Sequence, residues 1–142
     1  MTDTQETLPM PGLATAVTSG RVLEVQVAAL AAGLGLEVRT QYKIGRRIWG
    51  AVRKIDLILT HPGDRQRLGV ECKYQGTQGS AEEKIPLILQ DIGAWPIPGI
   101  VVFAGDGFSP HMQGYLLSSG KAVELEDLEP WLRLYFGLEL RG

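Results

Sequence analysis

Residues 54–75 read KIDLILTHPGDRQRLGVECKYQ, and the expected fold is built around them. Two runs, Lys54 to Thr60 and Leu68 to Gln75, alternate with the period of two that is typical of β-strands. Turn-forming residues between Pro62 and Arg65 predict that the two strands form a hairpin. One face is expected to carry Ile55, Leu57, Leu59, Leu68, Val70, Cys72 and Tyr74. The other is expected to carry Lys54, Asp56, Ile58, Thr60, Gly69, Glu71, Lys73 and Gln75.

The turn sets which residues of the two strands face each other. If the loop is centred between Gly63 and Asp64, Asp56 and Glu71 lie equally far from its centre and are directly opposed. Directly opposed residues have Cβ atoms roughly 4.5 to 5.5 Å apart. Two carboxylates so placed repel each other unless a cation lies between them or one is protonated. The register therefore predicts a site for Mg²⁺, which prefers oxygen ligands.

Lys73 follows Glu71 by two residues, so strand periodicity puts both on one face, and Gln75 continues the row. The backbone carbonyl of Cys72 lies between the two charged side chains. A metal held by Asp56 and Glu71 would polarise a phosphate and acidify a bound water, which Lys73 would orient or help to deprotonate. This set suits hydrolysis of a phosphodiester bond. The alternative is ordinary, because Glu and Lys alternating on a strand usually form a solvated face.

Apolar periodicity and capping residues predict the remaining elements. Helices are expected from Thr18 or Ser19 to about Leu34, from Ala81 to about Ile92, from Ser109 to Leu117 and from Asp127 to Phe136. Strands are expected at Val38–Ile44, Ile100–Ala104 and Ala122–Leu125. A meander followed by crossovers gives an α/β fold, a mixed central sheet with helices on both faces. Residues 18–142 are expected to form a single domain, and residues 1–17 a flexible arm.

The composition is that of an ordinary globular protein, with 44% hydrophobic and 21% charged residues. The single cysteine, Cys72, excludes an internal disulfide and a cysteine-based zinc site, and it suits a reducing cytoplasm. The longest apolar stretches are shorter than a membrane span, and no signal-peptide pattern opens the sequence. A cytoplasmic protein is therefore expected.

The charges are unevenly distributed along the chain, whose formal net charge is −2. Nine of the fourteen basic residues, and only three acids, lie between Arg39 and Lys73, whereas nine acids and four bases follow from Glu82 onward. The basic region could meet an anionic polymer such as DNA, or it could be a basic surface without that role. The expected contacts with nucleic acid come from Lys43, Arg46, Arg47, Arg53 and Lys84.

One spacing has a counterpart in a known family. Asp56, fifteen residues before Glu71-Cys72-Lys73 on adjacent strands followed by a helix, resembles the motif of the PD-(D/E)XK nuclease superfamily. The resemblance covers about residues 20 to 105 and implies a restriction-endonuclease-like core. Ile55 stands where the motif often has a proline.

The resemblance also implies roles for particular residues. Asp56 and Glu71 would bind Mg²⁺, for which Mn²⁺ can substitute, and the Cys72 carbonyl would assist. A glutamate from the first helix often joins such sites, and Glu24 is the matching candidate, although a solvent-facing helix acid would look the same. In some members a polar residue two past the lysine contacts the water or a phosphate. Gln75 matches that position, or is simply a polar strand end.

Taken together, these features predict a metal-dependent deoxyribonuclease, in particular an endonuclease. Because a double-strand break needs two cuts and one chain holds one site, a homodimer or larger symmetric assembly is expected. The alternatives are an inactive nucleic-acid-binding module on the same fold and a protein unrelated to nucleic acid. His61 and His111 are interpreted as structural, since neither has a visible catalytic partner.

Overall fold

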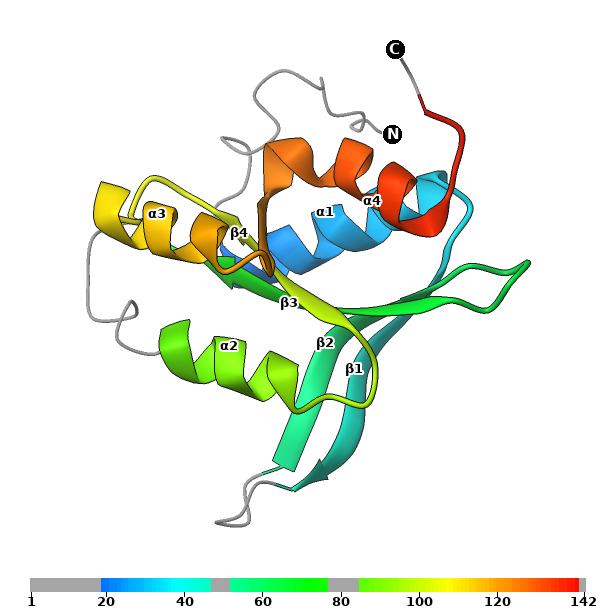
Figure 1. The fold of residues 1–142 in the computed structure, drawn as a ribbon, viewed down its shortest axis with the longest axis horizontal. Helices are drawn as coiled ribbons and strands as arrows, with labels where there is room; N and C mark the ends of the chain where they lie inside the picture. Colours follow the sequence, from blue (N-terminus) through cyan, green and yellow to red (C-terminus); the bar gives the residue numbers. More distant parts are fainter. Residues whose placement is uncertain (1–18, 47–51, 77–84, 141–142) are drawn as a thin grey trace.

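A computed structural model describes residues 19–46, 52–76 and 85–140 of the chain (Figure 1). In chain order the elements are α1 (Gly20–Gly33), β1 (Glu37–Arg46), β2 (Val52–Thr60), β3 (Arg67–Tyr74), α2 (Ile85–Gly93), β4 (Gly99–Ala104), α3 (Pro110–Ser118), β5 (Ala122–Glu124), the short 3₁₀ helix η4 (Leu125–Asp127) and α4 (Leu128–Phe136). The expected arm at residues 1–17 lies outside the described residues. Of the helices that the structure describes, none is long and apolar enough to cross a membrane.

The strands form one mixed sheet in the order β1-β2-β3-β4-β5. β2 is antiparallel to both β1 and β3, whereas β4 is parallel to both β3 and β5. Helices α1 and α4 cover one face with a core that includes Leu23 and Leu132, and α2 and α3 cover the other with a core that includes Ile85 and Leu116. In Figure 1, α1 and α4 lie above the sheet and α2 below it. The expected fold class is confirmed.

Capping serines begin α1 and α3 where the sequence predicted. Ser19 accepts a hydrogen bond from the Val22 N–H at 3.1 Å at the start of α1, and Ser109 accepts one from the Met112 N–H at 3.1 Å at the start of α3. In α2 the second residue is Pro86, where a missing N–H removes no helical hydrogen bond. Residues 81–84 of the helix expected there lie outside the described part of the chain.

The β2–β3 hairpin has the expected register. Leu57 pairs with Val70 and Thr60 with Arg67, and in each pair the two residues lie equally far along the chain from the predicted centre of the turn. A one-residue slip would have moved every side chain of β3 to the other face of the sheet. The polar row on β3 is therefore placed by the turn.

His61 closes the turn of this hairpin. Its N–H donates to the carbonyl of Gln66 at 2.9 Å, and its Nδ1 accepts the N–H of Gly63 at 2.9 Å. The backbone N–H and the ring Nδ1 of His61 thus both stabilise the turn. The interpretation of His61 as structural is confirmed.

The two strands of the hairpin separate after the Leu57–Val70 pair. From there β2 pairs only with β1, and β3 pairs only with β4. Figure 1 shows β1 and β2 curving away from β3. We call this point of separation the fork. Asp56 and Glu71 are the first residues beyond it, so they face each other across a widening gap and are not paired in the sheet.

The alternation of β2 changes at Asp56. Ile55 packs in the core beneath α2 together with Ile58, not with Leu57 on the α1 side. The expectation that Ile55 and Leu57 share a face is therefore wrong. At the same point the neighbouring strand is irregular, because Gln41, opposite Asp56, has a φ of 53° and is missing from the β1–β2 pairing. An irregularity of this kind twists the strand and changes the direction of the next side chain.

Two glycines make room for the indole of Trp95 in the core beneath α2. Gly69 on β3 and Gly99 on β4 are partners in the sheet, and Trp95 is 7% exposed. A Cβ added to Gly69 would lie 2.7 Å from the Trp95 ring, and one added to Gly99 would lie closer still. The indole therefore rests directly against the backbone of both strands.

We predict that Gly69→Ala and Gly99→Ala each lower the free energy of unfolding by about 1 to 3 kcal/mol, because the added methyl overlaps the indole. Urea denaturation followed by circular dichroism measures this change. Gly114→Ala on α3 is the matched control, since a Cβ there has no atom within 4 Å and alanine favours a helix. Wild-type stability in Gly69→Ala would show that the indole does not occupy this space.

Candidate active site at the fork of the sheet

Asp56 bridges the fork with its side chain. The residue is 9% exposed, and its Oδ2 accepts a hydrogen bond from the backbone N–H of Cys72 at 3.0 Å. The N–H groups of β3 that point toward β2 are those of Leu68, Val70 and Cys72, by the alternation of an antiparallel ladder. Because β2 has turned away, the Asp56 carboxylate takes the place of a strand carbonyl. This bond fixes the carboxylate at the point where the strands diverge.

Glu71 lies on the other side of the fork, with its side chain 19% exposed. Burial, the carboxylate of Asp56 and, to a lesser extent, that of Asp91 together raise its pKa to about 7, against the opposing effect of Lys73. Lys73 Nζ lies 3.6 Å from Glu71 Oε2, and the lysine side chain remains 40% exposed. The ammonium group can therefore reach both Glu71 and solvent.

Glu24 on α1 completes an acidic group at the fork. Burial and, next, the carboxylate of Asp56 raise the pKa of Glu24. Gln41, the residue of positive φ on β1, donates its Nε2 to Glu24 Oε1 at 2.9 Å. The first helix thus turns Glu24 toward the fork, as the family resemblance implies. Its role there stays a prediction.

The donor set suits a hard divalent cation, although it is not closed around one. Among the residues that the structure describes, no three His, Cys, Asp or Glu side chains lie close enough to form a ready metal site. The donors at the fork are nevertheless carboxylate oxygens, the ligands that Mg²⁺ prefers. The pKa values of Glu24 and Glu71 are both raised by Asp56, which shows negative charge without full compensation. A cation between these groups would relieve that repulsion.

Cys72 contributes only its backbone to this site. Its thiol is buried in the core on the α1 side, and burial raises the thiol pKa, so that the group is neutral. The sequence pattern predicted this orientation. A neutral buried thiol is a poor metal ligand, and the carbonyl of Cys72 as a ligand stays a prediction.

Gln75 lies beyond the end of β3 and is 6% exposed. Its side-chain Nε2 donates to the backbone carbonyl of Gly107 at 2.8 Å, and the backbone carbonyl of Gln75 accepts the Gly107 N–H at 2.7 Å. These bonds hold the loop after β4 against the end of β3. The first of these bonds satisfies the side-chain Nε2, and the catalytic role expected for Gln75 stays a prediction.

Sequence reasoning missed Asp91, which pairs with a residue expected to bind DNA. Arg53 Nε lies 2.8 Å from Asp91 Oδ1, and both side chains are largely buried. The pair joins β2 to α2 beside Glu71. The available signal was the single acid in the largely apolar helix Ile85–Gly93.

The other expected contacts with nucleic acid are partly described. Lys43 is exposed on β1, directly opposite the exposed Lys54 of β2. Arg47 and Lys84 lie outside the described residues, and so does the side chain of Arg46.

Comparisons with known proteins identify the family of the chain. A family model described as a PD-(D/E)XK nuclease superfamily domain matches residues 15–132. The crystal structure of a protein of unknown function, AF1548, superposes with a TM-score of 0.50 at 18% identity, covering 71% of this chain and 55% of that one. Protein VC1899 from Vibrio cholerae gives a TM-score of 0.48 at 13% identity, over 82% of this chain and 32% of that one. The chain thus spans about half the length of the first, and no curated protein matches it.

The raised pKa of Glu71 predicts a pH dependence of stability. Between pH 4.5 and about 7 the folded chain keeps a proton on Glu71 that the unfolded chain has released, so stability falls as pH rises through this window. Glu71→Gln removes that fall. Relative to wild type, we expect it to gain on the order of 1 to 3 kcal/mol from pH 4.5 to 7.5.

Urea titrations at several pH values in EDTA measure this difference. Glu126→Gln, which removes an exposed carboxylate from η4, controls for the loss of one charge. Parallel pH profiles for Glu71→Gln and wild type would show that Glu71 titrates normally.

Proposed function

The chain belongs to the PD-(D/E)XK nuclease superfamily, and from this premise we propose that it is a metal-dependent endonuclease that hydrolyses phosphodiester bonds of DNA. Membership confirms the resemblance drawn from Asp56 and Glu71-Cys72-Lys73. One observation carries the proposal. The fork brings Asp56 and Glu71 from two strands to one gap, with Lys73 beside them.

Each residue at the fork has a distinct role in this proposal. Asp56 and Glu71 would hold Mg²⁺ or Mn²⁺, which when bound polarises the scissile phosphate and acidifies a water. The Cys72 N–H keeps the Asp56 carboxylate in one orientation, so that little side-chain freedom is lost on binding. Lys73, half-exposed and 3.6 Å from Glu71, would hold the attacking water or a phosphate oxygen.

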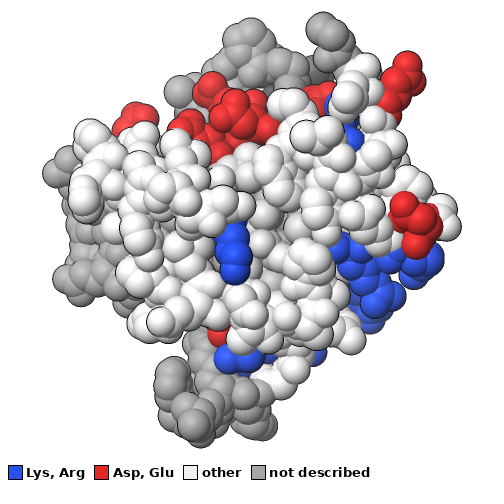
Figure 2. All heavy atoms as spheres, viewed as in Figure 1, with Lys and Arg blue, Asp and Glu red and all other residues white. Residues whose placement is uncertain are grey.

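The charge distribution supports an anionic polymer as the substrate. Figure 2 shows basic side chains gathered over the three antiparallel strands and acidic ones gathered at the opposite edge of the molecule, over η4 and α4. Lys43 and Lys54 are direct partners on β1 and β2, and like charges so placed repel. Lys54 also lies near enough to Glu24 to lower its pKa. A phosphate bound between the two lysines would relieve their repulsion beside the fork.

We predict metal-dependent cleavage that requires the residues of the fork. The purified chain is incubated with supercoiled plasmid, linear duplex, single-stranded DNA and RNA, in Mg²⁺, Mn²⁺ or EDTA. Plasmid nicking is expected in Mg²⁺ and absent in EDTA. Asp56→Asn and Lys73→Met should each lower the rate by about 100-fold or more, since each removes a group that acts in the transition state.

Lys121→Met is the matched control, because it removes an exposed lysine just before β5 that has no role in the proposed site, and this variant should cut normally. Circular dichroism checks that each variant folds. Binding of DNA without cutting in any metal would favour an inactive nucleic-acid-binding module on the same fold. Cleavage of RNA alone would contradict DNA as the substrate.

We further propose that two chains act together to cut both strands, with α4 at the interface. Leu134 on α4 is 74% exposed, although neighbouring Trp131 and Tyr135 stack on each other at 5.2 Å. In a symmetric dimer the same face of α4 would meet its copy, and Leu134 is the exposed apolar side chain that would be buried there. Light scattering should give twice the chain mass for wild type and the single mass for Leu134→Glu. A monomeric wild type, both alone and with DNA, would contradict the proposal.

A further inference from the structure

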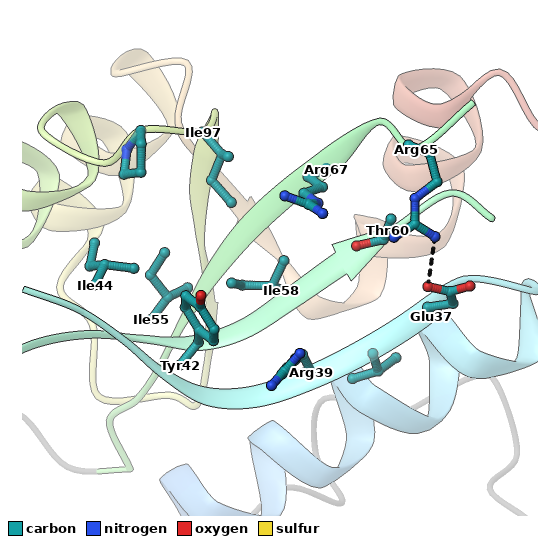
Figure 3. A pocket seen from close by; sticks show the side chains of 12 residues that line it. Glu37, Arg39, Tyr42, Ile44, Ile55, Ile58, Thr60, Arg65, Arg67 and Ile97 are labelled. Atoms are coloured by element: carbon teal, nitrogen blue, oxygen red, sulfur yellow. Dashed lines mark hydrogen bonds and ion pairs between the residues drawn. The ribbon is translucent and has the colours of Figure 1, made fainter. Parts of the chain in front are cut away.

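A separate groove of about 530 Å³ lies over the outer part of β1, β2 and β3, on the α2 side of the sheet (Figure 3). Its lining includes Arg39, Arg65, Arg67, Tyr42 and several isoleucines, and we call it the arginine groove. None of the acids at the fork and no lysine contributes to its lining. The groove is therefore a feature that the proposed active site does not use.

Trp95 separates the arginine groove from the fork. Every second residue of β3 lies on the same face, so Arg67, Gly69 and Glu71 form a row. The indole of Trp95 rests on Gly69, between the other two. Arg67 and Glu71 are four residues apart, which is roughly 13 Å along a strand. The groove and the acidic site are thus neighbours with a wall between them.

The rim of the groove carries uncompensated positive charge. Arg65 Nη1 lies 3.1 Å from Glu37 Oε1, the pair marked by the dashed line in Figure 3. Within the described part of the chain, no carboxylate forms an ion pair with Arg39 or Arg67. Guanidinium groups bind phosphate through two parallel hydrogen bonds. The rim therefore suits a phosphate or another compact anion.

The floor of the groove is apolar and partly flat. Figure 3 shows Ile55 and Ile58 rising from the sheet, with Ile97 facing them from the far side. Tyr42 is 42% exposed, and the Arg39 guanidinium lies 5.4 Å from the centre of its ring. Aromatic rings and guanidinium planes are the surfaces on which unpaired bases stack.

These two surfaces together select the chemistry of the ligand. A bare anion would leave the isoleucine floor exposed to water, and an uncharged ring would leave Arg39 and Arg67 without a counter-charge. The volume falls in the range of small-molecule sites and is far larger than a single ion needs. The ligand should therefore join a flat, largely apolar ring to an anionic group.

We propose that the arginine groove binds a nucleotide unit, with the base against Tyr42 and the isoleucine floor and the phosphate between Arg39 and Arg67. The unit is a free nucleotide or an unpaired nucleotide of a nucleic-acid strand. A base inside a duplex is stacked on both faces and cannot enter. The proposal does not depend on nuclease activity, since the groove and the fork share no residue.

Binding is measured in EDTA by calorimetry or fluorescence anisotropy on the full chain. The probes are a nucleoside monophosphate, a short 5′-phosphorylated single strand, a blunt duplex and inorganic phosphate. The monophosphate or the single strand should bind at least tenfold more tightly than phosphate or duplex. Which of the two binds better identifies the source of the nucleotide.

Variants connect that binding to the groove. Arg39→Gln and Arg67→Gln should each weaken nucleotide binding about tenfold or more, and Tyr42→Ala should weaken nucleotide but not phosphate binding. Lys121→Gln, with the same loss of charge elsewhere, should bind normally, and thermal melting checks the fold of each. Asp56→Asn should abolish cutting and keep this binding, which separates the two proposals. The groove proposal is overturned if no nucleotide binds, if phosphate or duplex binds as tightly, or if the arginine variants bind as wild type does.

Discussion

The hydrogen bond from the Cys72 N–H to the Asp56 carboxylate is the constraint on which the rest of this molecule depends. Where two neighbouring strands of a sheet separate, a buried N–H is left without a strand partner, and leaving it unpaired costs about 1 to 3 kcal/mol. Here a side chain supplies the missing acceptor. The strands can then diverge, β1 and β2 can curve away, and a gap opens beside Glu71. The same carboxylate that closes the ladder thus also faces the candidate metal site, so fold and chemistry share one group.

The electrostatics of the fork oppose folding. Glu24, Asp56 and Glu71 come from three different elements, and burial combined with mutual repulsion raises the pKa of two of them. Lys73 and the Arg53–Asp91 pair offset only part of this charge. Clusters that cost stability in this way are typical of functional sites, where the missing compensation comes with the ligand.

One row of side chains on β3 serves two different surfaces. Glu71 and Lys73 belong to the fork, whereas Arg67 belongs to the arginine groove, and the Trp95 indole on Gly69 stands between them. Both glycines beneath the indole are needed because it lies against the backbone of β3 and β4. The core that stabilises the α2 side of the sheet therefore also divides an acidic surface from a basic one.

The sequence by itself determined the elements, the hairpin register and the family, because turns, caps and alternation are local and Asp56 and Glu71-Cys72-Lys73 lie on one hairpin. It could not show where β2 leaves β3, since after Leu57 β2 follows β1 and after Val70 β3 follows β4, and no pattern within the hairpin records that point. Ile55 was assigned to the wrong face because strict alternation was assumed through Asp56, where the structure breaks it. The pairing of Arg53 with Asp91 and the burial of Gln75 against Gly107 were likewise decided by tertiary structure. Each contact joins segments more than thirty residues apart in the sequence, and no local sequence pattern predicts that such segments will meet.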